Sequence, residues 1–232
     1  MPRPRLRALT ALATLAAALL AAAPGRAADT CGSSAYAYAG LVDATPRYGV
    51  GATISVLRRP ALLAGHIAAW VGVGGVGLGP NGTDEWLQAG VSVERTNGLA
   101  IYYELALPGT APQYVHLPGR VSPGTRLRIA VVESAARRDV WRVYVNGRAR
   151  SAAIVLPGSH GAWRPVATTE SWNGGVGACN GFAFGFSGLT VAARPGGSWT
   201  PLEGSVLDSP AFHVARNANG FVAAGGPITF AG

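Results

Sequence analysis

Glu85-Trp-Leu-Gln-Ala-Gly-Val-Ser-Val-Glu94 is the stretch of sequence from which the fold follows most directly. Successive side chains of a β-strand point to opposite faces, so the stretch divides into two alternating sets. One set is apolar: Leu87, Ala89, Val91 and Val93. The other set is Trp86, Gln88, Gly90, Ser92 and Glu94. We therefore expect a strand that packs its apolar set on a core and presents Gln88 beside Trp86, with Gly90 leaving room for a ligand.

The same alternation recurs on both sides of this stretch. Ala100–Leu107 places Tyr102 and Glu104 opposite the apolar set Ile101, Tyr103, Leu105 and Leu107. His66–Val73 places Trp70 opposite Ile67, Ala69, Val71 and Val73, and in Val166–Trp172 one face carries Val166, Thr168, Glu170 and Trp172. Aromatic side chains beside amides and carboxylates on one sheet face are typical of a groove for an extended substrate.

Short β-rich runs bounded by glycine and proline continue along the chain, and no apolar pattern of helical period persists. The further expected strands are Gly51–Leu57, Arg126–Ser134, Trp141–Asn146, Ala152–Leu156, Phe182–Val191 and a last one near Ala211–Val214 or Gly220–Ala224. Asn146-Gly147 predicts a type I′ hairpin turn, and Gly72–Gly82 is interpreted as a glycine-rich loop. The fold class is therefore all-β, a two-sheet antiparallel β-sandwich of jelly-roll type.

The N-terminal residues have the pattern of an export signal. Arg3, Arg5 and Arg7 precede an uncharged, alanine-rich stretch, and Gly25 and Ala27 suit a cleavage site. We expect residues 1–27 to be a signal peptide and residues 28–232 to form a single β-sandwich domain that is secreted. Glycine, proline and arginine interrupt every later apolar run, so no stable membrane association is expected after signal removal.

The net charge, the histidines and the cysteines limit the classes of partner and cofactor that the chain is expected to bind. The formal net charge of the 232-residue chain is +8, and loss of the four signal arginines lowers it to +4. No basic run is interleaved with aromatics, which argues against nucleic acid as a partner. The scattered histidines show no metal-ligand spacing, so neither a metal nor another cofactor is expected. The two cysteines, Cys31 and Cys179, predict a disulfide in an exported chain, which would close a loop of roughly 150 residues and stabilise by about 4 kcal/mol.

Four short sequence motifs, in the same order along the chain, resemble those of the eqolisin family of glutamic endopeptidases. They are His66-Ile-Ala-Ala-Trp-Val-Gly-Val-Gly-Gly75, Trp86-Leu-Gln-Ala-Gly90, Ile101-Tyr-Tyr-Glu-Leu-Ala-Leu-Pro108 and Pro123-Gly124-Thr125. The resemblance implies a concanavalin-like sandwich that hydrolyses peptide bonds in acid with a Gln–Glu dyad. Gln88 falls on the family's glutamine, and Glu170 aligns with the second glutamate of the family's Ala-Glu-Trp-Ile-Val-Glu motif. The first glutamate and the Trp-Ile-Val word of that motif are missing from Pro165–Trp172.

Two functions follow from these observations. In the first, the chain is an acid endopeptidase: Glu170 is the general base and then the acid, Gln88 donates to the oxyanion, and Trp70, Trp86, Tyr102 and Glu104 bind a polypeptide substrate. In the second, the sandwich is a non-catalytic module that binds a glycan or a protein. The altered glutamate motif favours the second function, as does Trp141-Arg-Val-Tyr-Val-Asn-Gly147, which resembles a hairpin of laminin-G and lectin-like sandwiches.

Overall fold

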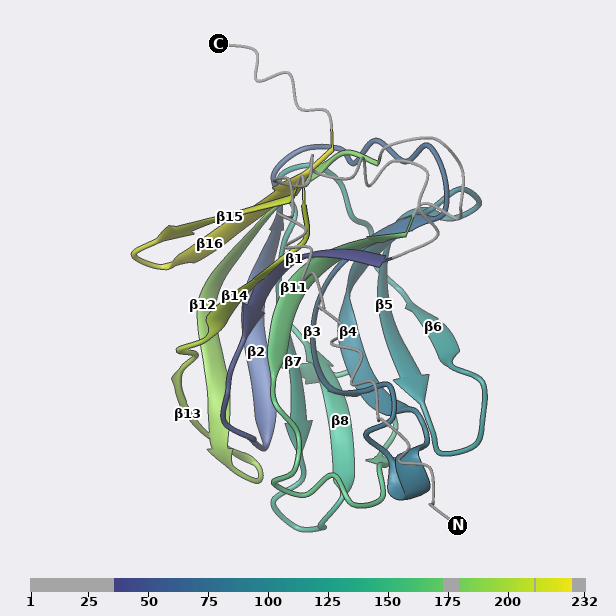
Figure 1. The fold of residues 1–232 in the computed structure, drawn as a ribbon, viewed down its shortest axis with the longest axis vertical. Helices are drawn as coiled ribbons and strands as arrows, with labels where there is room; N and C mark the ends of the chain where they lie inside the picture. Colours follow the sequence, from purple (N-terminus) through teal and green to yellow (C-terminus); the bar gives the residue numbers. More distant parts are fainter. Residues whose placement is uncertain (1–35, 173–179, 211, 227–232) are drawn as a thin grey trace, which may run out of the picture.

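The computed structural model describes residues 36–172, 180–210 and 212–226, and these form two antiparallel sheets that overlie each other (Figure 1). The seven-stranded sheet has the order β14 (Ser205–Asp208), β1 (Tyr36–Val42), β11 (Val166–Trp172), β3 (His66–Gly75), β4 (Glu85–Glu94), β5 (Gly98–Ala106) and β6 (Gln113–Leu117). The nine-stranded sheet has the order β10 (Ile154–Val155), β8 (Val140–Val145), β7 (Arg126–Glu133), β2 (Gly49–Val56), β12 (Phe182–Arg194), β16 (Gly220–Gly225) and β15 (Phe212–Asn217). β13 (Gly197–Pro201) pairs with β12, and β9 (Arg148–Ala149) pairs with β8.

The predicted fold class and the predicted faces of the strands are confirmed. The core between the sheets contains the apolar sets of β3 and β4 and, from β5, Ile101 and Leu105; Tyr103 and Leu107 pack against it. The nine-stranded sheet contributes large side chains, among them Trp141, Phe182, Phe184, Phe186 and Phe221. Burial of these apolar surfaces, at roughly 25 cal/mol per Å², is the main force that holds the sheets together.

Several elements differ from the sequence-based expectation. The glycine-rich segment 72–82 is not one loop, because β3 continues to Gly75 and a short 3-10 turn, η1, spans Pro80–Gly82. Strands β1, β6, β13 and β14 were not predicted, and both alternatives for the last strand exist, as β15 and β16. Asn146 and Gly147 both have positive φ, so the predicted hairpin turn is confirmed. No helix in the described residues is long and apolar enough to cross a membrane.

The seven-stranded sheet contains a cross-strand row in which two glycines leave space for neighbouring backbone. The row consists of register partners on four adjacent strands: Gly40 on β1, Thr168 on β11, Trp70 on β3 and Gly90 on β4. A Cβ on Gly90 would lie 2.0 Å from the Ala69 carbonyl oxygen, and one on Gly40 would lie 2.3 Å from that of Ala167. The backbone of the adjacent strand therefore occupies the space of both missing side chains, and the strands can approach only because these residues are glycine.

A buried carboxyl lies at one end of the core. Glu85 begins β4 on the apolar face, is fully buried, and neither carboxyl oxygen has a hydrogen-bond partner. Burial, and secondarily the charge of Asp139, raises the pKa of Glu85 to about 7. The folded state therefore favours the protonated, neutral form of this side chain.

Gly90→Ala should destabilise the fold by on the order of 1–3 kcal/mol, because the new methyl group overlaps the Ala69 carbonyl and forces β3 and β4 apart. Gly185→Ala is the matched control, since a Cβ at that position on β12 meets its nearest atom at 3.5 Å, an ordinary contact distance. The measurement is urea denaturation of both variants. Equal stability of the two variants would contradict the assigned close approach.

Glu85→Gln should stabilise the protein at neutral pH and leave it nearly unchanged in acid. The folded pKa lies near 7 and the unfolded value near 4.5, so the wild type loses stability as pH rises between these values, by at most about 3 kcal/mol. The variant lacks the titration and should lose less. Denaturant unfolding of both proteins at about pH 4 and about pH 8 measures the difference. A gain of the same size at both pH values would show that the carboxyl does not titrate as described.

Candidate functional site

The polar outer face of the seven-stranded sheet brings most of the predicted site residues together. Gln88 on β4 is the register partner of Glu104 on β5, and Gly90 is that of Tyr102. On the other side of β4, Trp70 on β3 pairs with Gly90 and with Thr168 on β11, and Glu170 lies two residues further along β11. All these side chains follow the even-numbered alternation and therefore share one face.

The Gln88 amide is held by two neighbours on β5. Its Nε2 donates to the Tyr102 hydroxyl and to Oε2 of Glu104, each at 3.3 Å. Tyr102 is itself buried beneath Tyr114, whose ring stacks on it with centroids 4.7 Å apart, and Tyr114 shares a short hydrogen bond with Ser92. The amide at position 88 is thus oriented by a packed support, which is what a positioned hydrogen-bond donor requires.

Glu104 is a carboxylate in an acidic, partly desolvated environment. Burial raises its pKa, the charge of Glu170 raises it further, and hydrogen bonds from Trp86 and Gln88 together with the charge of His66 lower it. The same two carboxylates contribute, after burial, to the raised pKa values of Tyr36, Tyr38 and Tyr102. The two side chains therefore lie near enough for the charge of Glu170 to raise the pKa of Glu104.

Glu170 is buried and lies with its Oε1 3.4 Å from Nε2 of His66. It makes no hydrogen bond to Gln88, whose carboxylate partner is Glu104. The register aligns Gln88 with Val166, so Glu170 is displaced by four residues, roughly 13 Å along the strand direction. Thr168 occupies the outer-face position between these two levels. The predicted pair thus lies on one face without direct contact, and Glu104 stands next to the glutamine.

Two cavities meet at the carboxylates. One, of about 340 Å³, is lined by Gln88, Trp70, Trp86 and the glycines at the end of β3, and the second, of about 210 Å³, by His66, Ser92 and Tyr114. Tyr36, Glu104 and Glu170 line both. We call the combined depression the Glu104–Glu170 groove. A chain lying along it would pass the two carboxylates near its middle.

Sequence reasoning missed several residues of this groove. Tyr36 and Tyr38 come from β1, where Tyr36 packs on His66 and Trp172 with centroid distances of 5.7 and 6.3 Å. The alternation of tyrosine with alanine in Tyr36-Ala-Tyr-Ala was the signal that identifies them as an outer-face pair. Tyr114 comes from β6, a five-residue strand with only a weak pattern. His66 was not predicted as a site residue, and its Nε2 pairs with Oε1 of Glu170.

Other predictions fall on different parts of the chain. Cys31 and Cys179, together with the expected signal peptide, lie outside the described residues. Among the residues that the structure describes, no group of three or more histidine, cysteine, aspartate or glutamate side chains could hold a metal ion. The Nε1 of Trp70 is buried and has no hydrogen-bond partner.

Comparison with known proteins supports the fold. No protein-family model and no curated protein sequence matches the chain. A solved structure of Scytalido-glutamic peptidase with a peptide-based transition state analog matches with a TM-score of 0.54 and 16% identity, over 83% of this chain and 97% of that chain. SCP-B, a member of the eqolisin family of peptidases, in a complex with the tripeptide Ala-Ile-His, matches with a TM-score of 0.50 and 16% identity, over 83% and 98% of the two chains. The chain thus has the two-sheet, concanavalin-like sandwich found in these glutamic peptidases.

Proposed function

We propose that the protein is an exported endopeptidase that hydrolyses polypeptides in acid at the Glu104–Glu170 groove. The observation that carries the proposal is that Glu104 and Glu170 line both cavities, with Glu104 bonded to the oriented Gln88 amide. An extended peptide can cross such a groove with a central bond at the carboxylates. In this proposal residues 1–27 are removed on export and residues 28–232 form the working domain.

The proposed chemistry divides the work between the two carboxylates. Ionised Glu170 removes a proton from a water molecule, whose oxygen attacks the carbonyl carbon of the scissile bond. The Gln88 amide is the donor proposed for the resulting oxyanion. Protonated Glu104 then donates its proton to the leaving nitrogen as the carbon–nitrogen bond breaks. One proton has moved onto Glu170 and one has left Glu104, so proton exchange between them restores the starting state.

The proposed acid dependence follows from Glu104. Its raised pKa keeps it protonated to a higher pH than an ordinary glutamate. Protonation of Glu104 also weakens the hydrogen bond that it accepts from Gln88, so the Gln88 N–H becomes available to the substrate. The rate should therefore fall as the pH rises through the pKa of Glu104, because the proton donor is lost.

Proteolysis of an unfolded substrate at about pH 4 should fall by roughly 100-fold or more in Gln88→Ala, Glu104→Gln and Glu170→Gln, as expected for loss of an oxyanion donor or an acid–base group. Release of peptides from a reduced, alkylated protein, followed by mass spectrometry, measures the rate. Glu203→Gln, an exposed residue between β13 and β14, is the matched control and should retain full activity. Wild-type-like rates in all three site variants, or absence of cleavage by the wild type, would refute the assignment.

Glu170→Gln should also lower the pKa of Glu104, since it removes the charge that is the second cause of the upward shift while burial, the first cause, remains. A ¹³C NMR titration of the Glu104 carboxyl in both proteins tests this independently of catalysis. Glu203→Gln should leave the titration where it is. An unchanged Glu104 titration in Glu170→Gln would mean that the two carboxylates do not share the groove.

A further inference from the structure

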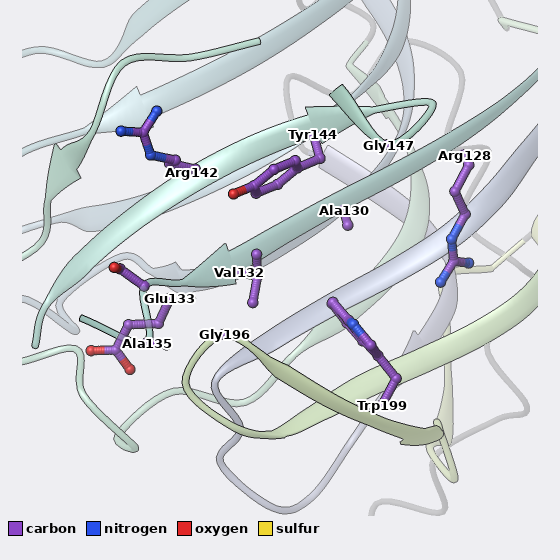
Figure 2. Close-up of a pocket in the computed structure, with 11 residues that line it drawn as sticks. Arg128, Ala130, Val132, Glu133, Ala135, Arg142, Tyr144, Gly147, Gly196 and Trp199 are labelled. Carbon is purple, nitrogen blue, oxygen red and sulfur yellow. The ribbon is translucent and has the colours of Figure 1, made fainter. Parts of the chain in front are cut away.

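A second groove lies on the outer face of the nine-stranded sheet, on the opposite side of the sandwich from the Glu104–Glu170 groove. Figure 2 shows Ala130 and Val132 of β7 between Arg142 and Tyr144 of β8 on one side and Arg128 and Trp199 on the other. Tyr144 is the register partner of Ala130, and Arg142 is that of Val132. Small side chains between larger ones leave a cavity of about 420 Å³, which we call the Trp199 groove.

The turn that precedes Trp199 is held in a defined backbone conformation. Gly196, Gly197 and Ser198 all have positive φ, which glycine adopts readily and serine rarely. The N–H of Gly196 donates to the Glu133 carbonyl at 2.7 Å and so fastens this turn to the end of β7. Trp199 follows on β13 with 41% of its surface exposed, a large fraction for a tryptophan. The turn thus places Trp199 in the lining of the groove with much of its ring exposed to solvent.

The groove offers positive charge. Arg128 donates to the Gly188 carbonyl at 2.6 Å and to the Thr190 hydroxyl at 2.8 Å, and it is half-buried. The guanidinium of half-buried Arg142 has no ion-pair or hydrogen-bond partner among the residues that the structure describes. Glu133 also lines the groove, but its side chain is fully buried, accepts from the Asp139 N–H, pairs with His160 and forms no ion pair with either arginine.

We propose that the Trp199 groove binds an acidic oligosaccharide built of uronic acid residues. A sugar ring stacks on the exposed indole of Trp199, as flat apolar sugar faces do on aromatic rings, and the uronate carboxylates pair with Arg142 and Arg128. Arginine suits this role because its planar guanidinium matches a carboxylate in two parallel hydrogen bonds. The two arginines are offset by four residues across β7 and β8, roughly 13 Å along the strands, so an oligomer of several sugars is needed to reach both.

Titration of the full chain with a defined hexa-galacturonate at neutral pH tests the proposal by calorimetry. The wild type should bind, and Arg142→Gln and Trp199→Ala should each weaken binding at least tenfold. Both variants should keep the wild-type melting temperature, because Arg142 has no partner and Trp199 is exposed. Arg120→Gln, an exposed arginine in the loop between β6 and β7, is the matched control and should bind as the wild type does. Binding should weaken as salt is raised.

Two further ligands separate the proposed class from others. The methyl-esterified hexamer keeps the rings and removes the charge, and it should bind at least tenfold more weakly. A poly-glutamate peptide keeps the charge and removes the rings, and it should not compete. Absence of hexa-galacturonate binding, equal binding of the methyl ester, or effective competition by the peptide would overturn the proposal. Trp199→Phe retains a ring and should lose less affinity than Trp199→Ala.

Discussion

The whole outer face of the seven-stranded sheet depends on a steric constraint: at Gly40 and Gly90 the neighbouring backbone occupies the space that any side chain would take. These two positions flank Trp70 and Thr168 in one cross-strand row, between the level of Gln88 and the level of Glu170. Glycine at these two positions lets β1 pair with β11 and β3 pair with β4 at this row without a clash, and the polar side chains on either side of the row depend on that pairing.

The carboxylates on that face are held at an energetic cost. Glu170 is buried and Glu104 half-buried, the charge of Glu170 raises the pKa of Glu104, and three tyrosines around them have raised pKa values from burial and from these two charges. Such a cluster does not add to the stability of a sheet. Sites that transfer protons, however, need groups whose pKa values differ from those in water. The hydrogen bonds from Trp86 and Gln88 offset part of the cost at Glu104 and fix its orientation.

Alternation along single strands was enough to predict the core and the outer face, because β4 and β5 each carry a clean two-residue period. The position of Gln88 beside Glu104 required the register of the β4–β5 hairpin, which no single-strand pattern contains. The position of Glu170 required more, since β11 lies between β1 and β3, strands that are far from it in sequence. The sequence therefore pointed to part of the candidate site but missed Tyr36, Tyr38 and Tyr114, and it paired Gln88 with Glu170 where the register places Glu104 beside Gln88.

The buried carboxyl of Glu85 has a consequence for where the molecule can persist. A proton binds the Glu85 carboxyl more tightly in the folded chain than in the unfolded one. By mass action, this group therefore adds to the stability of the fold in acid, and the contribution is lost towards neutral pH. A buried group in the core thus contributes a dependence of the folding stability on the pH of the surroundings. Transfer from an acidic to a neutral medium removes the stability that this one group contributes, without any ligand or partner taking part.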